Sequence, residues 1–381
     1  MRILIDALSA RHGGGITYMH YLPQALAATD TENEYMVLVS SCYQQRIIKA
    51  LPTSWKIIDV SLSEEAFLNR WWYLQTKLPS LVRQYEIDIL FTVIEMASLT
   101  VPCKKVVLVR NFSFYAPLNL YATLNQKLFI FFYRLTREPL VYLSLLRADR
   151  VLFVSSELRY FIQRHLPLPK HKQTAVLYHG LGNEFRYTFH KDWDDLKHNY
   201  SLAVSSIMPH KNYELLIRAY AHFASDSAHL THELLIAGHA EDQKLYHKLC
   251  LLVDELNLNN RVRFLGNVTH SELILLYQKA RIFVFPSKLE TFGHPLVEAM
   301  SSGVPVLASD LPICHEICQS AALYFSSINT TELAISWRRV LEDTALQETM
   351  IRRGLERASC FSWDRTAKLL VENFRQVTAK I

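Results

Sequence analysis

Two glutamates that bracket a glycine and a proline form the most informative segment of the sequence. The segment reads Glu290-Thr-Phe-Gly293-His-Pro295-Leu-Val-Glu298 and follows the apolar run 282–285. Pro295 suits the first turn of a helix, where its missing N–H is not needed. The N–H groups and dipole at a helix start favour an anion such as a diphosphate. Gly293 has no side chain to keep a phosphate oxygen away from the backbone.

The two carboxylates are suited to hold two ends of one ligand. Glu298 lies about one turn into the expected helix, within reach of a ribose or sugar beside the phosphate, and carboxylates often hold ribose hydroxyls. On a continuous helix Glu290 would lie roughly 12 Å away. Gly293 and Pro295 interrupt that helix, so we do not expect the close carboxylate pair of a retaining glycosidase. Alternatively, Glu290 is a solvated loop residue and Glu298 makes only local contacts.

A second polar segment, Ser206-Ile-Met-Pro-His-Lys211, follows the strand predicted over 202–207. Its lysine could neutralise the charge of a departing diphosphate. The alternative is a solvent-facing lysine at the start of the next helix.

The first half of the chain offers weaker signals. Gly13-Gly14-Gly15 follows the first apolar run but is an incomplete G-x-G-x-x-G, which alone is weak. It fits either a loop beside a sugar and phosphate or a plain tight turn. Arg110-Asn111 follows another apolar run, and an arginine there could stabilise negative charge.

Short apolar runs alternate with helical patterns, which predicts two α/β units with parallel sheets wrapped on both faces. In the first unit we predict strands at 2–6, 35–39, 55–60, 87–92, 106–109, 151–154 and 174–177, with helices at 16–28 and 74–85 and one or two helices at 124–146. In the second we predict strands at 202–207, 233–237, 262–265, 282–285 and 304–309, with helices at 213–224, 242–256, 271–280 and 295–302.

The domain boundaries follow from this pattern. The polar stretch 180–200 lacks periodicity and is the best linker, and only helices are expected after residue 329. We therefore expect domains at 1–182 and 183–362, and a final helix at 363–381. Ligands bind at the carboxyl ends of the strands in such sheets. The fold alone, however, does not determine which reaction the protein catalyses.

Composition narrows the class of protein. Of 381 residues, 50% are hydrophobic and 20% charged, which is typical of globular domains. A net charge of +5 is too small to indicate that the protein binds nucleic acid. No stretch reaches the ~18 apolar residues of a membrane span, and no signal peptide is recognisable, so we expect a cytoplasmic protein. The six scattered cysteines are expected to be reduced core residues. Cys314 and Cys318 lack a second cluster to complete a metal site.

The segment around Glu290 and Glu298 matches the E-x-F-G-x-P-x-x-E-A signature of glycosyltransferase family 4. Pro286-Ser287 before it and Gly303-Val-Pro-Val after it agree as well. The chain therefore resembles these retaining enzymes. The resemblance implies the α/β GT-B fold, with two Rossmann-like doubly wound domains facing across a cleft. It also implies a C-terminal helix that crosses back to the N-terminal domain.

The resemblance also implies roles for individual residues. Glu298 would bind the donor ribose, Glu290 would act on the transferred sugar, and Lys211 would bind the diphosphate. Backbone groups would face the diphosphate at Gly293, His294, Leu296 and Val297. Residues lining the nucleobase would be Gly266, Asn267 and Val268, and Gly14 and Gly15 would approach the donor from the first domain. Ser206 stands where the family usually has an arginine, and Arg110 stands where many members have a histidine.

The expected activity is transfer of a hexose-type sugar from a UDP- or GDP-sugar to a hydroxyl of a polysaccharide or lipid-linked glycan, as in lipopolysaccharide synthesis. No metal or cofactor is implied, and no nucleic acid. In this fold the first domain takes the acceptor, and its basic aromatic segments, 71–73 and 127–137, could dock peripherally on a membrane or pack in the core. A catalytically degenerate nucleotide-sugar-binding module and a sugar-nucleotide epimerase remain as alternatives.

Overall fold

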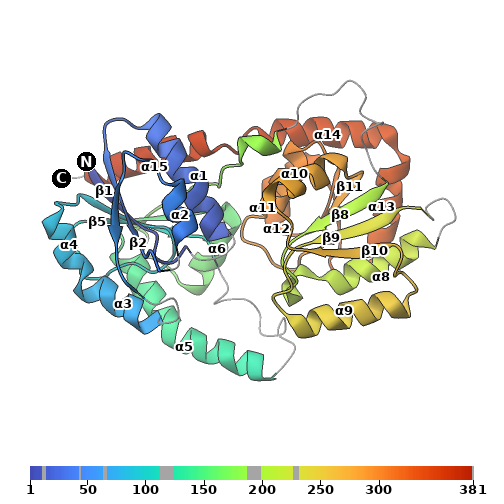
Figure 1. Ribbon diagram of the computed structural model, residues 1–381, viewed down its shortest axis with the longest axis horizontal. Coiled ribbons are helices and arrows are strands. Elements are labelled where there is room, and N and C mark those ends of the chain that lie inside the picture. The colour runs from blue at the N-terminus through green and yellow to red at the C-terminus, as the bar shows by residue number, and fades with distance from the viewer. Residues whose placement is uncertain are drawn as a thin grey trace. The chain divides into compact units, whose positions relative to one another are not determined.

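Two parallel sheets, each covered by helices, make up the protein (Figure 1). The computed structural model describes residues 1–10, 14–42, 44–62, 67–111, 124–186, 199–225 and 231–379. These residues fold as two compact units. The described parts of 1–111, 124–180 and 362–379 form unit 1, and those of 181–361 form unit 2.

Unit 1 contains a seven-stranded parallel sheet in the order β3-β2-β1-β4-β5-β6-β7. The strands are β1 (Arg2–Asp6), β2 (Glu34–Val39), β3 (Lys56–Asp59), β4 (Ile89–Thr92), β5 (Lys104–Val109), β6 (Arg150–Phe153) and β7 (Gln173–Val176). The helices are α1 (Gly14–Thr29), α2 (Gln45–Ala50), α3 (Phe67–Thr76), α4 (Leu78–Gln84), α5 (Leu124–Arg147), α6 (Ser156–His165) and α15 (Trp363–Thr378). The strand order reverses between β1 and β4.

Unit 2 contains a six-stranded parallel sheet in the order β10-β9-β8-β11-β12-β13, which reverses between β8 and β11. The strands are β8 (Tyr200–Val204), β9 (Glu233–Ala237), β10 (Val262–Gly266), β11 (Ile282–Phe285), β12 (Val306–Ser309) and β13 (Ala322–Phe325). The helices are α8 (Tyr213–Ala224), α9 (Gln243–Glu255), α10 (His270–Lys279), α11 (His294–Ser301), α12 (Pro312–Cys318), α13 (Thr330–Glu342) and α14 (Thr344–Ala358). Three-residue 3₁₀ turns cover Asn183–Phe185, Pro209–Lys211 and Gln319–Ala321.

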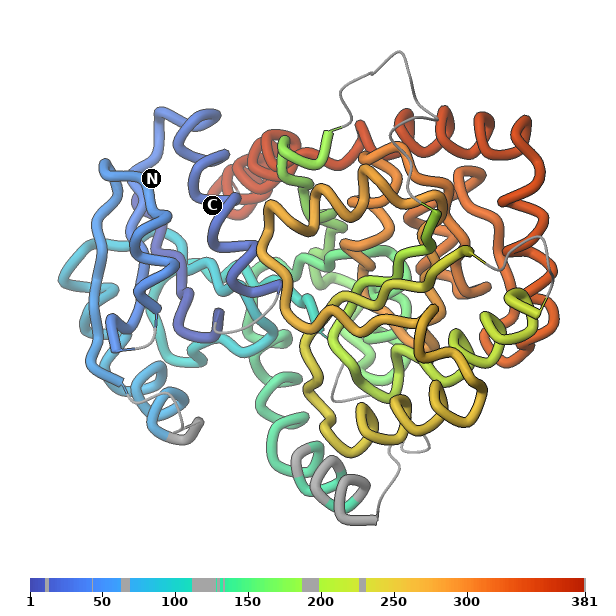
Figure 2. Tube along the Cα trace, turned by 45° about the vertical axis from the view of Figure 1, so that its right-hand side comes forward, coloured from blue at the N-terminus to red at the C-terminus, as the bar shows by residue number. Residues whose placement is uncertain are grey.

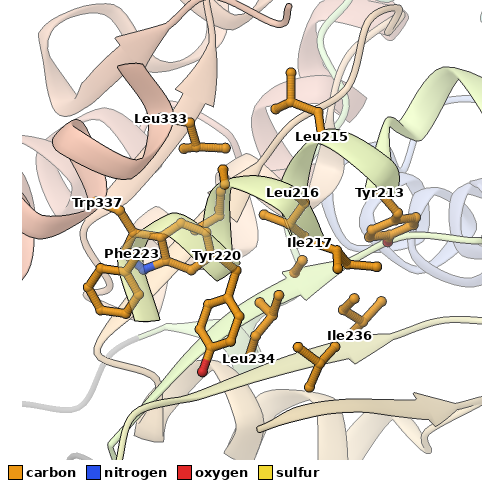
Figure 3. Close-up of a cluster of buried hydrophobic side chains, with 14 of the residues drawn as sticks. Tyr213, Leu215, Leu216, Ile217, Tyr220, Phe223, Leu234, Ile236, Leu333 and Trp337 are labelled. Atoms are coloured by element: carbon orange, nitrogen blue, oxygen red, sulfur yellow. The ribbon is translucent and has the colours of Figure 1, made fainter. Parts of the chain in front are cut away.

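The core of unit 2 lies between its sheet and the helices α8 and α13 (Figure 3). The ring of Trp337 stacks on Phe223, with centroids 5.5 Å apart. Its indole N–H donates to the Ser201 hydroxyl at 2.7 Å, so the only polar atom of this buried ring is paired. Aliphatic side chains from α8 and β9, including Leu216 and Leu234, fill the space beside the rings. The packed core holds the strand ends, and the loops on them, in fixed positions.

The final helix returns to unit 1, although it follows unit 2 in the sequence. Trp363 packs against Tyr18 and Tyr21 of α1, with ring centroids 5.4 and 5.8 Å apart. Figure 2 shows this red segment beside the blue amino-terminal elements. A Cβ on Gly180 would lie 2.3 Å from the Trp363 nitrogen, so only glycine allows this approach. The two termini thus belong to the same unit.

The expected α/β class with two Rossmann-like sheets is confirmed. The predicted bounds agree for α8, β9 and β11. Among the described helices and strands, α2, α6, α12 and β13 were not predicted. The predicted single helix at 74–85 is wrong, because α3 ends at Thr76 and α4 begins at Leu78, with Pro79 in its first turn. Proline is favoured at that point because no N–H is needed there.

Two predicted strands in unit 2 are displaced at their ends. The strand predicted over 202–207 ends at Val204, and Ile207 instead donates its N–H to the carbonyl of His239. The strand predicted from 304 begins at Val306, because Gly303 has a φ of +64° and Val304 bonds back to Ala299 as part of the helix end. None of the helices within the described ranges combines the length and apolar character needed to cross a membrane.

Candidate functional site

Lys211 and Glu290 meet at the point in unit 2 where the strand order reverses. Lys211 follows β8 and Glu290 follows β11, and these strands are neighbours in the sheet. The Lys211 Nζ lies 2.7 Å from the Glu290 Oε2, and each side chain is only 14% exposed. Residues 79 positions apart in the sequence are thus joined by the sheet topology. Open α/β sheets bind ligands at this reversal point.

Glu290 is held in its ionised form. Burial by itself would raise the pKa of this carboxyl, but the Lys211 ammonium, the N–H of Thr291 and His210 lower it below its usual value. The Thr291 N–H donates to the second carboxylate oxygen at 3.0 Å. Burial and the Lys211 charge lower the pKa of His210 to about 4, so this imidazole is neutral near pH 7. The site therefore presents one ammonium and one carboxylate in contact.

Helix α11 begins directly after this loop. Gly293 precedes it with a φ of +85°, a conformation that favours glycine. The Leu296 N–H donates to the Gly293 carbonyl at 3.0 Å, so this N–H is used within the turn. The side chains of Leu296 and Val297 are buried, and only their backbone could face a ligand. His294 begins the helix, and Pro295 occupies its first turn as expected.

Glu298 lies one turn into α11 and is held by a residue that the sequence did not indicate. The hydroxyl of Tyr277 from α10 donates to the Glu298 Oε2 at 2.9 Å. Burial raises the pKa of Glu298 to about 7, although this hydrogen bond and the nearby His270 oppose the shift. His270 contacts Glu184 at 2.7 Å. Glu290 and Glu298 therefore have pKa values shifted in opposite directions.

The loops after β8, β9 and β10 lie at the same edge of the unit 2 sheet, where the strands have their carboxyl ends. The Gly238 N–H donates to the Gly266 carbonyl at 2.8 Å. Gly266 has a φ of +64°, and nothing lies within 4 Å of where its Cβ would be. Asn267 is exposed, with its amide nitrogen 3.4 Å from a ring nitrogen of His239. The predicted nucleobase residues Gly266, Asn267 and Val268 are therefore contiguous with the loop that holds Ser206, which is partly buried.

The Arg110 side chain in unit 1 joins two segments of the chain by hydrogen bonds. Its Nε donates to the Val93 carbonyl at 2.7 Å and its Nη1 to the Gly14 carbonyl at 2.9 Å. Its guanidinium carbon lies 5.1 Å from the ring centroid of Tyr18. A Cβ on Gly15 would come within 3.3 Å of the arginine side chain. Arg110 thus fixes the start of α1; Gly13, from the same glycine run, lies outside the described residues.

Two buried carboxylates in unit 1 were not singled out as a site from the sequence. Asp6 ends β1, and burial raises its pKa to about 6. Glu95 follows β4 and is also buried, which raises its pKa despite the positive charges of Arg110 and Arg70. Their common position at the sheet reversal follows from topology alone. Nothing in the spacing of residues 6, 70 and 95 could have shown it.

The cysteines only partly match their expected place in the core. Cys314 and Cys318 are buried, but Cys42 is exposed and the other three are partly exposed. The expectation of a core position is therefore wrong for Cys42. Within the described ranges, no group of three or more His, Cys, Asp or Glu side chains is arranged to hold a metal ion.

Comparison with known families identifies the domain that holds these residues. Residues 184–357 match the family described as glycosyl transferases group 1. The chain is similar to that family over 174 of its 381 residues. The group 1 domain contains Lys211, Glu290, Tyr277 and Glu298, and it coincides closely with unit 2.

Curated relatives match about half of the chain at moderate identity. The chain is 35% identical over 185 residues to the O-antigen chain mannosyltransferase RfbU of Salmonella typhimurium, covering 49% of each protein. It is 32% identical over 167 residues to the O-antigen chain mannosyltransferase B of Escherichia coli, covering 43% of this chain and 42% of that protein. The matches thus span about half the length of these relatives.

Solved structures share the whole fold at low identity. A sucrose-phosphate synthase from Thermosynechococcus elongatus matches with a TM-score of 0.75 at 19% identity, over 100% of both chains. Anabaena HepE in complex with UDP and glucose matches with a TM-score of 0.74 at 18% identity, over 99% of this chain and 100% of that one. The chain therefore has the GT-B type of fold.

Proposed function

We propose that the protein is a retaining glycosyltransferase that moves a hexose-type sugar from a UDP- or GDP-sugar to a hydroxyl of a growing polysaccharide or lipid-linked glycan. The observation that carries the proposal is the Lys211–Glu290 pair, 2.7 Å apart at the sheet reversal of a group 1 domain. The O-antigen mannosyltransferases among the relatives support a glycan acceptor and make mannose the first sugar to test.

The proposed reaction breaks the bond between the sugar C1 and the diphosphate oxygen. The acceptor oxygen forms the new bond to C1 on the same face, and its proton passes to the departing diphosphate. Lys211 would neutralise the charge that develops on the leaving group, because a fixed cation is effective in a partly dry site. Glu290 would hold hydroxyls of the sugar and support its positive charge in the transition state.

The donor would lie along the strand ends of unit 2. Glu298 would accept hydrogen bonds from the ribose, with Tyr277 fixing one of its two oxygens. The loop at Gly266, Asn267 and Val268 would line the base. Lys211 lies against Glu290, so a bound diphosphate would compete with Glu290 for the ammonium and leave the carboxylate to the sugar. No metal is needed in this scheme, because Lys211 and the backbone of α11 supply the positive charge.

A nucleotide-binding screen combined with a transfer assay tests the proposal. UDP, GDP, ADP and dTDP are compared by the rise they cause in the thermal midpoint, since a ligand of the folded state stabilises by mass action. One nucleotide should give a clear rise that Glu298→Ala removes. Glu348→Ala, an exposed glutamate on α14, is the matched control and should keep the rise.

The donor with that nucleotide is then tested for sugar transfer, with the anomeric configuration of the product read by NMR. Inversion at C1 would reject the retaining mechanism. Binding without transfer by any donor would favour a degenerate module, and release of an epimerised nucleotide sugar would favour an epimerase. If no nucleotide at millimolar concentration shifts the midpoint, the donor site itself is rejected.

A further inference from the structure

A hollow of about 660 Å³ opens at the amino-terminal edge of the unit 1 sheet. Its lining includes the first residues of two neighbouring parallel strands and of the strand between them and β4, namely Lys56 of β3, Glu34 of β2 and Arg2 of β1. Asp6 and Arg110 lie at the opposite end of the strands, where the sheet has its carboxyl edge. The volume falls within the ~300–1,000 Å³ of small-molecule sites. The proposed transfer reaction gives this hollow no role.

Three aromatic side chains line the hollow: Tyr35, Trp55 and Tyr85. The rings of Tyr35 and Trp55 stack with centroids 4.7 Å apart at an angle of 14°, and the Tyr35 hydroxyl donates to the Asp30 carboxylate at 2.5 Å. Both rings are largely buried and therefore held rigidly. Tyr85 is partly exposed, and the Lys56 Nζ lies 4.3 Å from its ring centroid. Rigid aromatic surface of this kind suits the flat C–H face of a sugar ring.

The charged groups of the hollow compensate one another. Its lining contains two cations, Arg2 and Lys56, and two carboxylates, Asp30 and Glu34, so it is formally neutral. The Arg2 Nε lies 3.2 Å from the Glu34 Oε2, and the Arg2 Nη1 contacts Glu86. A site for a phosphate, a nucleotide or an acidic chain would be expected to present an excess of positive charge. The hollow therefore favours a neutral ligand.

Neutral donors and acceptors supply the rest of its polar wall. Thr31, Ser54 and Gln84 line the hollow, and all three are exposed. Their side chains, and the indole N–H of Trp55, make no hydrogen bond to another residue within the described ranges, so a ligand could pair with them. Hydroxyl and amide groups both donate and accept, as the hydroxyls of a sugar do. An apolar ligand would instead cover these groups and leave them unpaired.

We propose that this hollow binds a neutral saccharide chain. A sugar ring would pack against the exposed part of Tyr85, and its hydroxyls would pair with Gln84, Ser54 and the Trp55 N–H. The inference rests on the proposed function for the origin of the chain, which would be the glycan that the transferase extends. A chain held at a second point keeps its free end at a higher effective concentration near the site of transfer.

Fluorine NMR of protein labelled with fluorotryptophan tests the proposal at the hollow itself. The chain has six tryptophans, and the variants Trp55→Phe and Trp337→Phe assign two of the resonances. The neutral probes are mannohexaose and maltohexaose. Mannose tests whether a single sugar suffices, and a heparin-derived hexasaccharide tests an anionic chain. Trp337 is buried in the unit 2 core and serves as the internal reference.

A neutral hexasaccharide should shift the Trp55 resonance with a Kd on the order of 1 mM, and the Trp337 resonance should not move. Mannose should bind at least about tenfold more weakly, because it makes fewer contacts. The heparin fragment should also bind at least about tenfold more weakly, because the lining has no excess of positive charge. The proposal is overturned if neither neutral chain shifts the Trp55 resonance, if mannose binds as tightly as the hexasaccharides, or if the anionic chain binds most tightly.

Two matched variants then separate occupation of the hollow from other surface effects. Ser54→Tyr adds a ring at an exposed position in the wall, and Ser80→Tyr adds one at an exposed serine of α4 outside it. Ser54→Tyr should weaken hexasaccharide binding at least about tenfold, whereas Ser80→Tyr should bind unchanged. Gln84→Ala adds no bulk and should weaken binding several-fold through the lost hydrogen bonds. Circular dichroism and the thermal midpoint establish that each variant folds. Equal binding by all three variants would reject the assignment of the site.

The transfer assay tests the consequence for the reaction. Ser54→Tyr should raise the KM of a long acceptor at least about fivefold relative to Ser80→Tyr, with kcat and the KM of a trisaccharide acceptor unchanged, because only a long chain can make both contacts. An unchanged KM for the long acceptor would reject the second contact. Saccharide binding at Trp55 in a protein that transfers no sugar would reject the proposed function alone. Transfer without binding at Trp55 would reject the saccharide site alone.

Discussion

Two glutamates of one short motif have opposite electrostatic surroundings, although they are only eight positions apart. Glu290 has an ammonium at 2.7 Å, which lowers its pKa. Glu298 has a tyrosine hydroxyl, and burial raises its pKa to about 7. The first is ionised throughout the physiological range, and the second changes its protonation state within it. A pair of carboxyls with separated pKa values is a common basis for different roles in one site.

Replacing Glu298 with glutamine should stabilise the protein at high pH. The folded-state pKa of about 7 lies above the ordinary 4.5, so stability falls as pH rises between these values and then levels off. Glutamine removes this cost, which is at most about 3 kcal/mol. The thermal midpoint of Glu298→Gln should exceed that of the unaltered protein by several degrees at pH 8, with little difference at pH 4.5. Equal midpoints at pH 8 would mean that burial does not disfavour the charge.

The same variant should bind the donor nucleotide at least about tenfold more weakly, because an amide accepts ribose hydrogen bonds less strongly than a carboxylate. Titration calorimetry at pH 8 measures this loss. Gain of stability with loss of binding is the usual signature of a strained functional residue. Tighter binding in Glu298→Gln would contradict a ribose role.

Removing the charge of Lys211 should cost both stability and activity. In Lys211→Met the Glu290 carboxylate remains buried without its ammonium, which should lower the free energy of unfolding by about 3 kcal/mol. Lys211→Met/Glu290→Gln should recover most of this loss, since neither charge then remains. Transfer should fall at least about 100-fold in both variants. Recovery of transfer in the double variant would show that the pair is structural.

Sequence periodicity identified those elements that are apolar throughout or strongly amphipathic. Helix α8 buries eight of its residues, and β11 is buried at every position, so their patterns were unambiguous. Helix α6 buries only Leu158 and Ile162, and three of the four β13 residues are partly exposed. These elements form because their neighbours in the fold cover one side of them. The pattern of apolar and polar residues within a short segment does not indicate such a tertiary contact.

Residues of the candidate site were predicted on several separate loops, but the contacts between those loops were not predicted. Glu290, Gly293 and Glu298 were found together because they lie within nine positions. Tyr277 was missed because it is one apolar position of an amphipathic helix, and its bond to Glu298 depends on how α10 packs beside α11. The ion pair of Lys211 with Glu290 depends on β8 and β11 being neighbours. Strand order is a property of the whole sheet.

Two glycines at the strand ends of unit 2 should respond very differently to alanine. A Cβ on Gly238 would lie 1.9 Å from the Ser205 carbonyl oxygen, whereas a Cβ on Gly266 would meet open space. Gly266→Ala should cost about 1–2 kcal/mol, for its left-handed φ alone. Gly238→Ala must also push β8 and β9 apart, so it should cost more and weaken nucleotide binding. Thermal midpoints check the order, and a larger loss for Gly266→Ala would contradict it.

On the scale of the whole molecule, the chain first forms most of unit 1 and then forms unit 2. Its last helix, α15, packs in unit 1 again. Aromatic contacts hold α15 in unit 1. The ring centroid of Phe374 in α15 lies 5.6 Å from that of Phe91 in β4, and Trp363 packs on α1. Thr366 also donates to the Tyr178 carbonyl at 2.9 Å. Helix α15 is therefore part of the unit 1 core, which is incomplete without residues 363–378.

Core substitutions in the two units should have separable effects. Phe374→Ala empties a fully buried position and should cost unit 1 about 3–5 kcal/mol. Hydrogen exchange followed by mass spectrometry should show faster exchange in peptides from residues 2–109 and 150–176, with unit 2 nearly unchanged. Trp337→Phe is the reciprocal variant, because it leaves the Ser201 hydroxyl without its indole partner in the unit 2 core. Its faster exchange should be confined to β8, α8 and α13. If Phe374→Ala accelerated exchange equally in both units, they would unfold as one cooperative body, and α15 would stabilise the whole molecule and not unit 1 alone.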